Sequence, residues 1–329
     1  MNRNTCTYAQ NGCAIAEQYE KKQRRKGPKI IAGLLVVCIL FGVAAMAGGE
    51  SVPTDDYIAV LDIAGTISEN DGYTYDQQYL LDSVDELMHD EYNKALLLRI
   101  DTPGGAVYQI DELYLKLMEY KEITGRPVYA AVESYAASGG YYVACAADAI
   151  YANRNAITGS IGVIMGEFLD VSELLDTLGV DVSYVASGAN KGMGSYYQPM
   201  TEEQRAIYQA ICDESYEQFV GIIADSRQMD DATVRKLADG RLYTASQALN
   251  HGLIDGIEPF DDTLERLTHD LGYREIDVWS YSYQAPAGLW EYLASGNIQK
   301  LVETLTGESD KKLLEASEPP QVMMYFNGY

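Results

Sequence analysis

Hydrophobic and polar residues follow two different periods along most of this 329-residue chain. Short, nearly continuous apolar runs, typical of strands buried on both faces, alternate with stretches in which apolar residues recur at helical spacing. Strands that alternate with helices predict an α/β domain with a largely parallel sheet. The predicted strands are Tyr57–Ile63, Ala95–Ile100, Pro127–Val132, Ala149–Ala152 and Val182–Val185.

The helical stretches lie between and after these runs. The longest begins with Thr201-Glu202-Glu203-Gln204, a capping-box pattern. Clear periodicity is lost after about Ser280, and the chain ends in an apolar, aromatic tail. We therefore predict a folded domain over residues 57–280 and a peripheral or interface extension over residues 281–329. The predicted helices are Tyr75–His89, Tyr108–Tyr120, Gly139–Ala147, Val171–Leu178, Thr201–Met229, Asp231–Ala238 and Ala245–Asn250.

The amino-terminal part has the pattern of a membrane anchor. Residues 30–49 carry no charge, and their length matches the roughly 20 residues of a membrane-spanning helix. Residues 1–29 hold seven basic and two acidic side chains, which predicts a cytoplasmic tail and an extracytoplasmic body. Residues 50–56 are then a linker. A cleaved signal peptide is the alternative, because small residues end the apolar run, but that run exceeds the usual ~7–15 residues.

Charge and cysteines narrow the choice of partners. The chain has 24 basic and 49 acidic residues, a net charge of −25, so we expect it to repel nucleic acid. None of the five cysteines has the spacing of a zinc site, and we expect neither a metal nor a cofactor. Cys145 and Cys212 lie in helical patterns and are predicted to be buried free thiols.

The stretch from Ser134 to Tyr142 has the pattern of a nucleophile turn. It joins the end of a predicted strand to the start of a predicted helix, and small residues surround Ser138. Small neighbours leave the serine open to a substrate carbonyl, and a helix start favours a developing oxyanion. The alternative is an ordinary strand-to-helix turn in which Ser138 is an N-cap.

An activated serine needs a base. The histidines His89, His251 and His269 lie at helix ends or in a surface-like helix, so none is marked as one. An uncharged lysine can serve instead, provided that burial lowers the usual lysine pKa of about 10.4. Lys191 is the candidate because small residues flank it and no acidic residue lies within four positions. The alternative is a solvated loop lysine.

Four motifs occur in the order and approximate spacing seen in bacterial signal peptide peptidase A, a family of serine–lysine proteases. The chain resembles the short single-domain form of that family. The resemblance spans roughly residues 57–267. It implies a ClpP/crotonase-like fold, anchorage in the bacterial cell membrane, a ring-like oligomer and cleavage of signal-peptide remnants. The motifs are Thr102-Pro103-Gly104-Gly105, Ala136-Ala137-Ser138-Gly139-Gly140-Tyr141-Tyr142, Ile157-Thr158-Gly159-Ser160-Ile161-Gly162 and Ser187-Gly188-Ala189-Asn190-Lys191.

The resemblance also implies roles for individual residues. Ser138 matches the nucleophile, Lys191 the general base, and Ser160 the serine that orients the lysine. The amides of Gly104 or Gly105 and of Gly139 match the oxyanion hole. Two departures bear on substrate preference. Asp101-Thr102 stands where the family often has Asn-Ser, and Gly192 stands where an acidic residue often follows the lysine.

Two other functions remain open at this point. One is a non-catalytic membrane scaffold of the same fold. The other is a crotonase-like acyl-CoA enzyme, since that fold also aims paired backbone amides at an oxyanion. If the chain is a protease, Ser138 and Lys191 can come from one subunit or from two neighbouring subunits of a ring.

Overall fold

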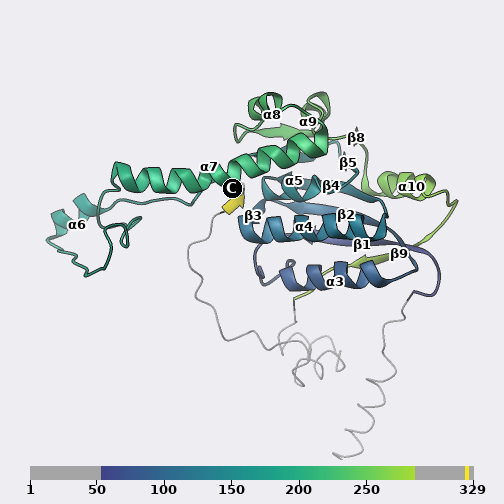
Figure 1. The fold of residues 1–329 in the computed structure, drawn as a ribbon, viewed down its shortest axis with the longest axis horizontal. Helices are drawn as coiled ribbons and strands as arrows, with labels where there is room; N and C mark the ends of the chain where they lie inside the picture. Colours follow the sequence, from purple (N-terminus) through teal and green to yellow (C-terminus); the bar gives the residue numbers. More distant parts are fainter. Residues whose placement is uncertain (1–52, 286–322, 326–329) are drawn as a thin grey trace, which may run out of the picture. The chain divides into compact units, whose positions relative to one another are not determined.

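The computed structural model describes residues 53–285 and 323–325, which form a mostly parallel sheet with helices on both faces (Figure 1). The predicted basic tail and membrane span lie outside the described residues. No helix within the described ranges is both long and apolar enough to cross a bilayer. The strands of the main sheet are β1 Tyr57–Ala64, β2 Asn93–Thr102, β4 Val128–Ala137, β5 Ala149–Ala152, β6 Ile157–Gly159, β7 Leu242–Thr244, β8 Gly256–Ile257 and β9 Asp277–Tyr281.

The order of the strands brings three carboxyl ends together. The main path runs β7-β6-β4-β2-β1-β9, and every pair is parallel except β6 with β7. Strand β4 pairs first with β5 and then, nearer its carboxyl end, with β6, while β8 extends β5. The carboxyl ends of β2, β4 and β6 therefore meet at one edge, where α/β proteins commonly place their ligand sites.

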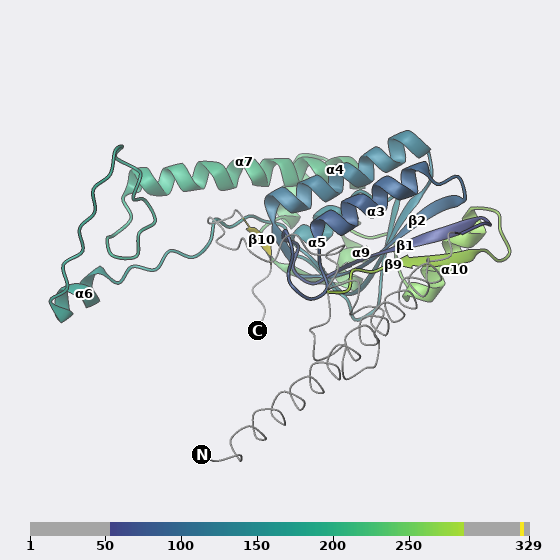
Figure 2. The same ribbon diagram turned by 90° about the horizontal axis from the view of Figure 1, so that it is seen from below.

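Helices bury both faces of the sheet, as the continuous apolar runs predict. Helices α3 (Gln77–His89), α4 (Val107–Thr124) and α5 (Gly139–Ala144) cover one face (Figure 2). On that face Leu61 and Ile63 of β1 join the larger apolar core. Ile58 and Val60 point the other way and pack with Leu267 of helix α10 (Phe260–Asp270).

Helix α7 (Glu202–Arg227) begins where the sequence predicts. Thr201 and Gln204 form the capping box, and each side chain binds the other residue's backbone amide. The carboxyl-terminal third of α7 is buried through residues such as Phe219 and Ile223. Helices α8 (Asp231–Leu237) and α9 (Ala245–Asn250) follow it at the positions predicted.

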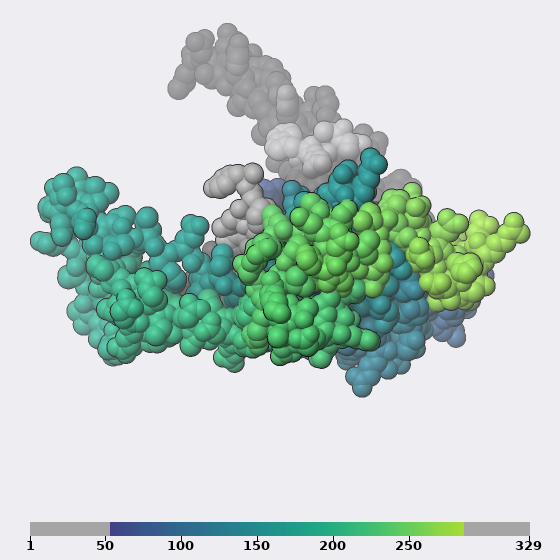
Figure 3. All heavy atoms as spheres, turned by 90° about the horizontal axis from the view of Figure 1, so that it is seen from above, coloured from purple at the N-terminus to yellow at the C-terminus, as the bar shows by residue number. Residues whose placement is uncertain are grey.

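We call residues 164–215 the arm. It contains helix α6 (Ser172–Leu178) and the first half of α7, and it reaches away from the sheet (Figure 3). Gln204 is the one buried residue within this range. The arm therefore has no hydrophobic core of its own.

The structure corrects the sequence prediction in the arm and adds strands elsewhere. The predicted strand Val182–Val185 is wrong, because this segment has no strand partner and Val185 is fully exposed. The short strands β6 to β9 were not predicted. A further strand, β10 (Met323–Tyr325), lies in the predicted extension and pairs antiparallel with β3 (Gly104–Ala106).

The two cysteines of the described region are free thiols, as predicted. Cys145 is buried behind α5, and this burial raises the pKa of its thiol to about 12. Cys212 is only partly buried. A thiol whose pKa lies so far above neutrality has little thiolate character, so Cys145 is a packing residue rather than a reactive one.

Candidate active site

Ser138 occupies a strained turn at the carboxyl end of β4. Its backbone has φ 53° and ψ −116°, a conformation that non-glycine residues rarely adopt, and its side chain is almost fully buried. The turn is held on both sides. The Ser138 amide donates to the Gly159 carbonyl (2.7 Å), and its own carbonyl accepts from the amides of Tyr141 and Tyr142. The hydroxyl makes no capping hydrogen bond, so N-cap formation does not explain this serine.

Two glycines let α5 approach the neighbouring elements closely. A Cβ on Gly139 would lie 2.1 Å from Cδ1 of Ile110 and 3.3 Å from Cα of Gly104. A Cβ on Gly140 would lie 2.7 Å from Cγ2 of Thr102. Any larger residue would push α5 off its neighbours. The backbones of Gly139 and Gly104 are therefore adjacent, as an oxyanion hole built from both segments requires.

The Pro103-Gly104-Gly105 turn has one engaged amide and one that faces outward. The Gly104 amide (φ +98°) donates to Oγ1 of Thr102 (3.1 Å), and that hydroxyl donates to the Gly65 carbonyl (2.5 Å). The Gly104 carbonyl and the Ala106 amide both bind the backbone of Ile67. Since successive peptide groups of a strand point in opposite directions, the Gly105 amide faces away from Ile67. Of the two glycine amides, that of Gly105 faces the outer edge of β3, where Met324 of β10 lies opposite it.

Ser160 lies at the next strand end. Its neighbour Gly159 pairs with Ala137, and the Gly159 carbonyl binds the Ser138 amide, so Ser138 and Ser160 sit on adjacent strand ends. Ser160 also has a positive φ of 51°, and its amide donates to the Arg241 carbonyl (2.8 Å). The structure thus gathers Ser138, Ser160 and the glycines of both predicted oxyanion segments.

Lys191 lies elsewhere in the same chain. It is exposed, in a turn of the arm between α6 and α7. The turn is fixed to the start of α7, where Asn190 donates to Glu203 (3.1 Å). The Ser138 helix α5 contacts α7 much further along, where Gln218 donates to the Tyr142 hydroxyl (2.7 Å). About 15 residues separate these two contacts on α7, roughly 22 Å of helix, so a single chain does not bring Lys191 to Ser138.

The three histidines lie at helix ends, and His89 and His251 do so as predicted. His89 ends α3 and its Nδ1 lies 2.8 Å from the Asp85 carbonyl. His251 caps α9 and packs against the ring of Tyr243. His269 is exposed in the last turn of α10. No Ser-His pair is formed within the part of the chain that the structure describes.

Thr102 and Asp101 are site-shaping residues that sequence reasoning treated only as departures from the family pattern. Thr102 is fully buried and braces the glycine turn. The Asp101 carboxylate accepts from the Tyr135 amide (3.1 Å), where the pairing of β2 with β4 shifts register. The feature of the sequence that could have identified them as site residues is their position directly before Pro103-Gly104-Gly105.

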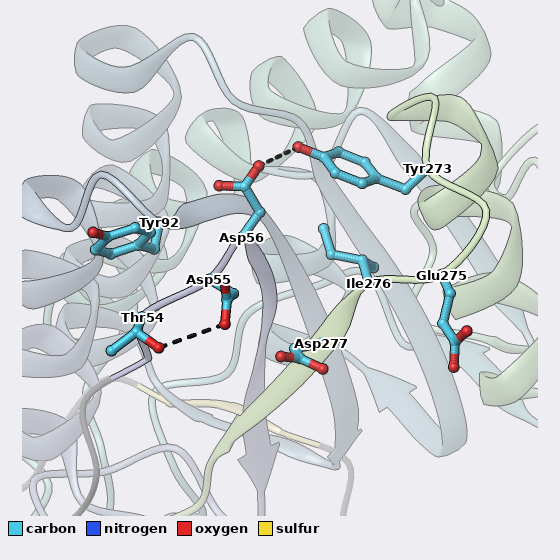
Figure 4. A pocket seen from close by; sticks show the side chains of 8 residues that line it. All are labelled: Thr54, Asp55, Asp56, Tyr92, Tyr273, Glu275, Ile276 and Asp277. Atoms are coloured by element: carbon cyan, nitrogen blue, oxygen red, sulfur yellow. Dashed lines mark hydrogen bonds between the residues drawn. The ribbon is translucent and has the colours of Figure 1, made fainter.

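A separate hollow of about 600 Å³ lies at the other end of the sheet (Figure 4). Its lining residues lie at or just before the amino-terminal ends of β1, β2 and β9, and Tyr273 donates a hydrogen bond to Asp56 there. Parallel strands place this hollow opposite the Ser138 edge, so it takes no part in the site. Within the described residues, no cluster of histidine, cysteine or carboxylate side chains has the arrangement of a metal site.

Comparison with known proteins shows the family of this chain. Residues 121–274 match the model of peptidase family S49. A protein of Enterococcus faecium, provisionally named signal peptide peptidase SppA, is 33% identical over 77% of this chain and 74% of its own length. A Methanocaldococcus jannaschii protein, provisionally named a protease, is 32% identical over 70% of this chain and 75% of its own length.

Among solved structures, a mutant of ClpP1 from Listeria monocytogenes covers 62% of this chain and 94% of its own, at 16% identity and a TM-score of 0.41. A score this low leaves the ClpP/crotonase-like assignment a prediction. The sequence relatives favour peptide hydrolysis over acyl-CoA chemistry. The chain belongs to peptidase family S49 and is a serine protease.

Proposed function

We propose that Ser138 cuts peptide bonds with Lys191 of a neighbouring subunit as its base. One observation carries this proposal. The strained, buried Ser138 directly precedes Gly139, whose backbone is adjacent to that of Gly104, while Lys191 projects on an arm that leaves its own domain. A second copy can bring that arm to the Ser138 edge and shield the amine from water. Ser160 then lies where it can orient the lysine.

The reaction follows from these groups. Neutral Lys191 takes the hydroxyl proton as Ser138 Oγ attacks the substrate carbonyl, and the Gly105 and Gly139 amides hold the oxyanion. The C–N bond then breaks, the amine leaves with the proton from Lys191, and an acyl-enzyme remains. Water, deprotonated by Lys191, hydrolyses that ester and restores Ser138. In known cases, one oxyanion donor contributes roughly 3–4 kcal/mol to transition-state stabilisation.

The surface of the arm supports assembly of several copies. Large apolar side chains are exposed along it, and a protein interface is one means of covering such side chains. A head-to-tail contact, in which the arm of one subunit lies on the body of the next, generates a ring when the rotation between neighbouring subunits closes. The exposed apolar residues of the arm include Phe168, Leu169, Leu174, Leu178, Val182, Val185 and Tyr196.

The membrane and substrate proposals depend on sequence. Residues 30–49 have the composition of a span, and we propose that they anchor the protease with its domain outside the cytoplasm, where it cuts signal-peptide remnants and other hydrophobic peptides. Alkaline carbonate washing of membranes tests the anchor. The full chain should stay with the lipid, and complete release into the wash would reject a spanning segment.

Single substitutions test the dyad. We expect Ser138→Ala and Lys191→Ala each to lower kcat for a reporter peptide at least about a thousandfold, because each removes a group that acts only in the transition state. The matched controls are Ser134→Ala, on the same strand, and Lys236→Ala; both residues are exposed and outside the site. Controls should keep wild-type turnover, and circular dichroism should show the same fold in all four variants. Turnover retained by either dyad variant would reject the mechanism.

A further inference from the structure

Two tyrosine hydroxyl groups hold the helix that follows Ser138. Tyr141 and Tyr142 are the only residues of α5 with polar side chains, and both are fully buried. The Tyr141 hydroxyl donates to the Leu253 carbonyl (2.6 Å), and the Tyr142 hydroxyl donates to Oδ1 of Asp111 (2.6 Å). The backbone amides of the same two tyrosines donate to the Ser138 carbonyl, at 3.0 and 3.1 Å. Contacts that fix these side chains therefore also fix the turn that carries Ser138.

The Tyr142 hydroxyl lies where three helices meet (Figure 1). Gln218 of α7 donates from Nε2 to this hydroxyl and to Oδ1 of Asp111, both at 2.7 Å, so a closed triangle of hydrogen bonds joins α4, α5 and α7. The Tyr142 ring packs against Phe219 and Tyr114, with centroids 5.0 and 5.3 Å away. Burial and the Asp111 carboxylate raise the pKa of Tyr142 well above its ordinary value, so this hydroxyl keeps its proton and remains a donor at neutral and mildly alkaline pH.

The conformation of Ser138 needs support from outside its own helix. A residue at φ 53° and ψ −116° is strained, and such strain persists only where the surrounding structure over-determines it. Helix α5 has six residues, which is too short to be stable alone. Gly139 and Gly140 allow close packing but have no side chains with which to anchor the helix. Tyr141 and Tyr142 are the first residues of α5 that can do so.

We propose that Tyr142 is a positioning residue for peptide hydrolysis, and that Asp111 and Gln218 hold its hydroxyl for this purpose. Tyr142 acts through the backbone of the first turn of α5, which it shares with Ser138. The inference rests on the proposed function for the identity of the nucleophile, but not for the identity of the base. A misplacement of about 1 Å can lower an enzymatic rate about 100-fold, so a small shift of α5 is enough to impair catalysis.

Removal of one hydroxyl tests the positioning role. We expect Tyr142→Phe to lower kcat for a reporter peptide about 10- to 100-fold and to leave KM within about twofold, because substrate still binds but the serine is presented less accurately. The matched control is Tyr120→Phe. Tyr120 is equally buried, and its hydroxyl donates to Asn93 (2.5 Å) at the opposite edge of the sheet, so this variant loses a comparable bond and should keep wild-type kcat. Unchanged kcat in Tyr142→Phe, or an equal fall in both variants, would overturn the proposal.

Asp111 provides a second test that leaves the tyrosine in place. Asp111→Ala removes the acceptor and should lower kcat about tenfold. Asp111→Asn keeps an oxygen for both donors and should restore most of the wild-type value. If the kcat of Asp111→Asn is no higher than that of Asp111→Ala, Asp111 does not act as the acceptor that holds Tyr142.

Hydrogen exchange measured by mass spectrometry tests the turn without turnover. Residues 138–145 should exchange faster in Tyr142→Phe than in wild type, and Tyr120→Phe should not change their exchange. An unchanged rate in Tyr142→Phe would reject the positioning role. If Ser138→Ala keeps wild-type turnover, the proposed function fails, and the exchange rates still decide whether Tyr142 holds this turn.

Discussion

At the scale of single residues, the site depends on backbone conformations that few side chains tolerate. Ser138 and Ser160 both have positive φ, and Gly139 and Gly140 have no room for a Cβ. The sequence placed Ser138 and its glycines correctly at a strand end, because small residues after an apolar run are a local signal, but it did not predict β6, at whose end Ser160 lies. The sequence did not predict that Thr102 is buried or that its hydroxyl hydrogen-bonds to Gly65 and Gly104. Both properties depend on how the surrounding segments pack.

Thr102 is the residue-scale test of the glycine turn. Thr102→Val keeps the volume of the side chain but removes the hydroxyl that binds Gly65 and Gly104. We expect kcat to fall about 10- to 100-fold, because the Gly105 amide loses its fixed position while the buried side chain is replaced without a cavity. Steady-state kinetics on a reporter peptide measure the effect, and Thr102→Ser should restore most of it. Wild-type kcat in Thr102→Val would show that the hydroxyl does not position the turn.

At the scale of elements, local patterns predicted helices well and short strands poorly. Helix α7 begins at its capping box, and α9 has the predicted bounds, because caps and helical spacing are local. Strands β7, β8 and β10 are only two or three residues long, and each is defined by a distant partner. The apolar run Val182–Val185 resembles a strand but finds no sheet to join, so it stays exposed on the arm.

The end of α7 is fixed to the body by one ion pair. Arg227 binds both carboxylate oxygens of Asp255 and the Gly252 carbonyl, and Asp255 also accepts from the Ile150 amide. Burial alone would raise the pKa of Asp255, but the bonds from Arg227 and Ile150 hold it below its ordinary value. A depressed carboxyl pKa stabilises the fold above the unfolded value of about 3.9, and this stabilisation is lost as the pH falls through the folded pKa.

Asp255→Asn should therefore destabilise the protein in a pH-dependent way. At pH 7 we expect the free energy of unfolding to fall by about 1–2 kcal/mol, since the pair is charged but partly exposed. The difference from wild type should shrink below about pH 4, where the wild-type carboxylate also becomes protonated. Urea unfolding at pH 7 and pH 3 measures both values. The exposed Asp181→Asn serves as control, and an equal deficit at both pH values would contradict the assigned role of the charge.

At the scale of the whole molecule, the described part of one chain holds the two residues of the proposed pair apart from each other. Ser138 is buried at the carboxyl-terminal edge of the sheet, next to the glycine segments of the proposed oxyanion hole. Lys191 is exposed on the arm. Sequence motifs predicted both residues but could not place them, because the distance between them depends on the path of the arm. The neighbouring subunit that we propose would cover the exposed apolar residues of the arm and would also bring a lysine to Ser138.

Mixed assembly tests that explanation most directly. Full-length Ser138→Ala and Lys191→Ala proteins, each inactive alone, are dissociated, mixed in equal amounts and allowed to reassemble before peptide hydrolysis is measured. If each site takes its serine from one subunit and its lysine from the next, random mixing restores about a quarter of wild-type activity. If serine and lysine come from the same chain, every site lacks one of them, and a mixture that stays inactive although the two proteins co-assemble would contradict the shared site.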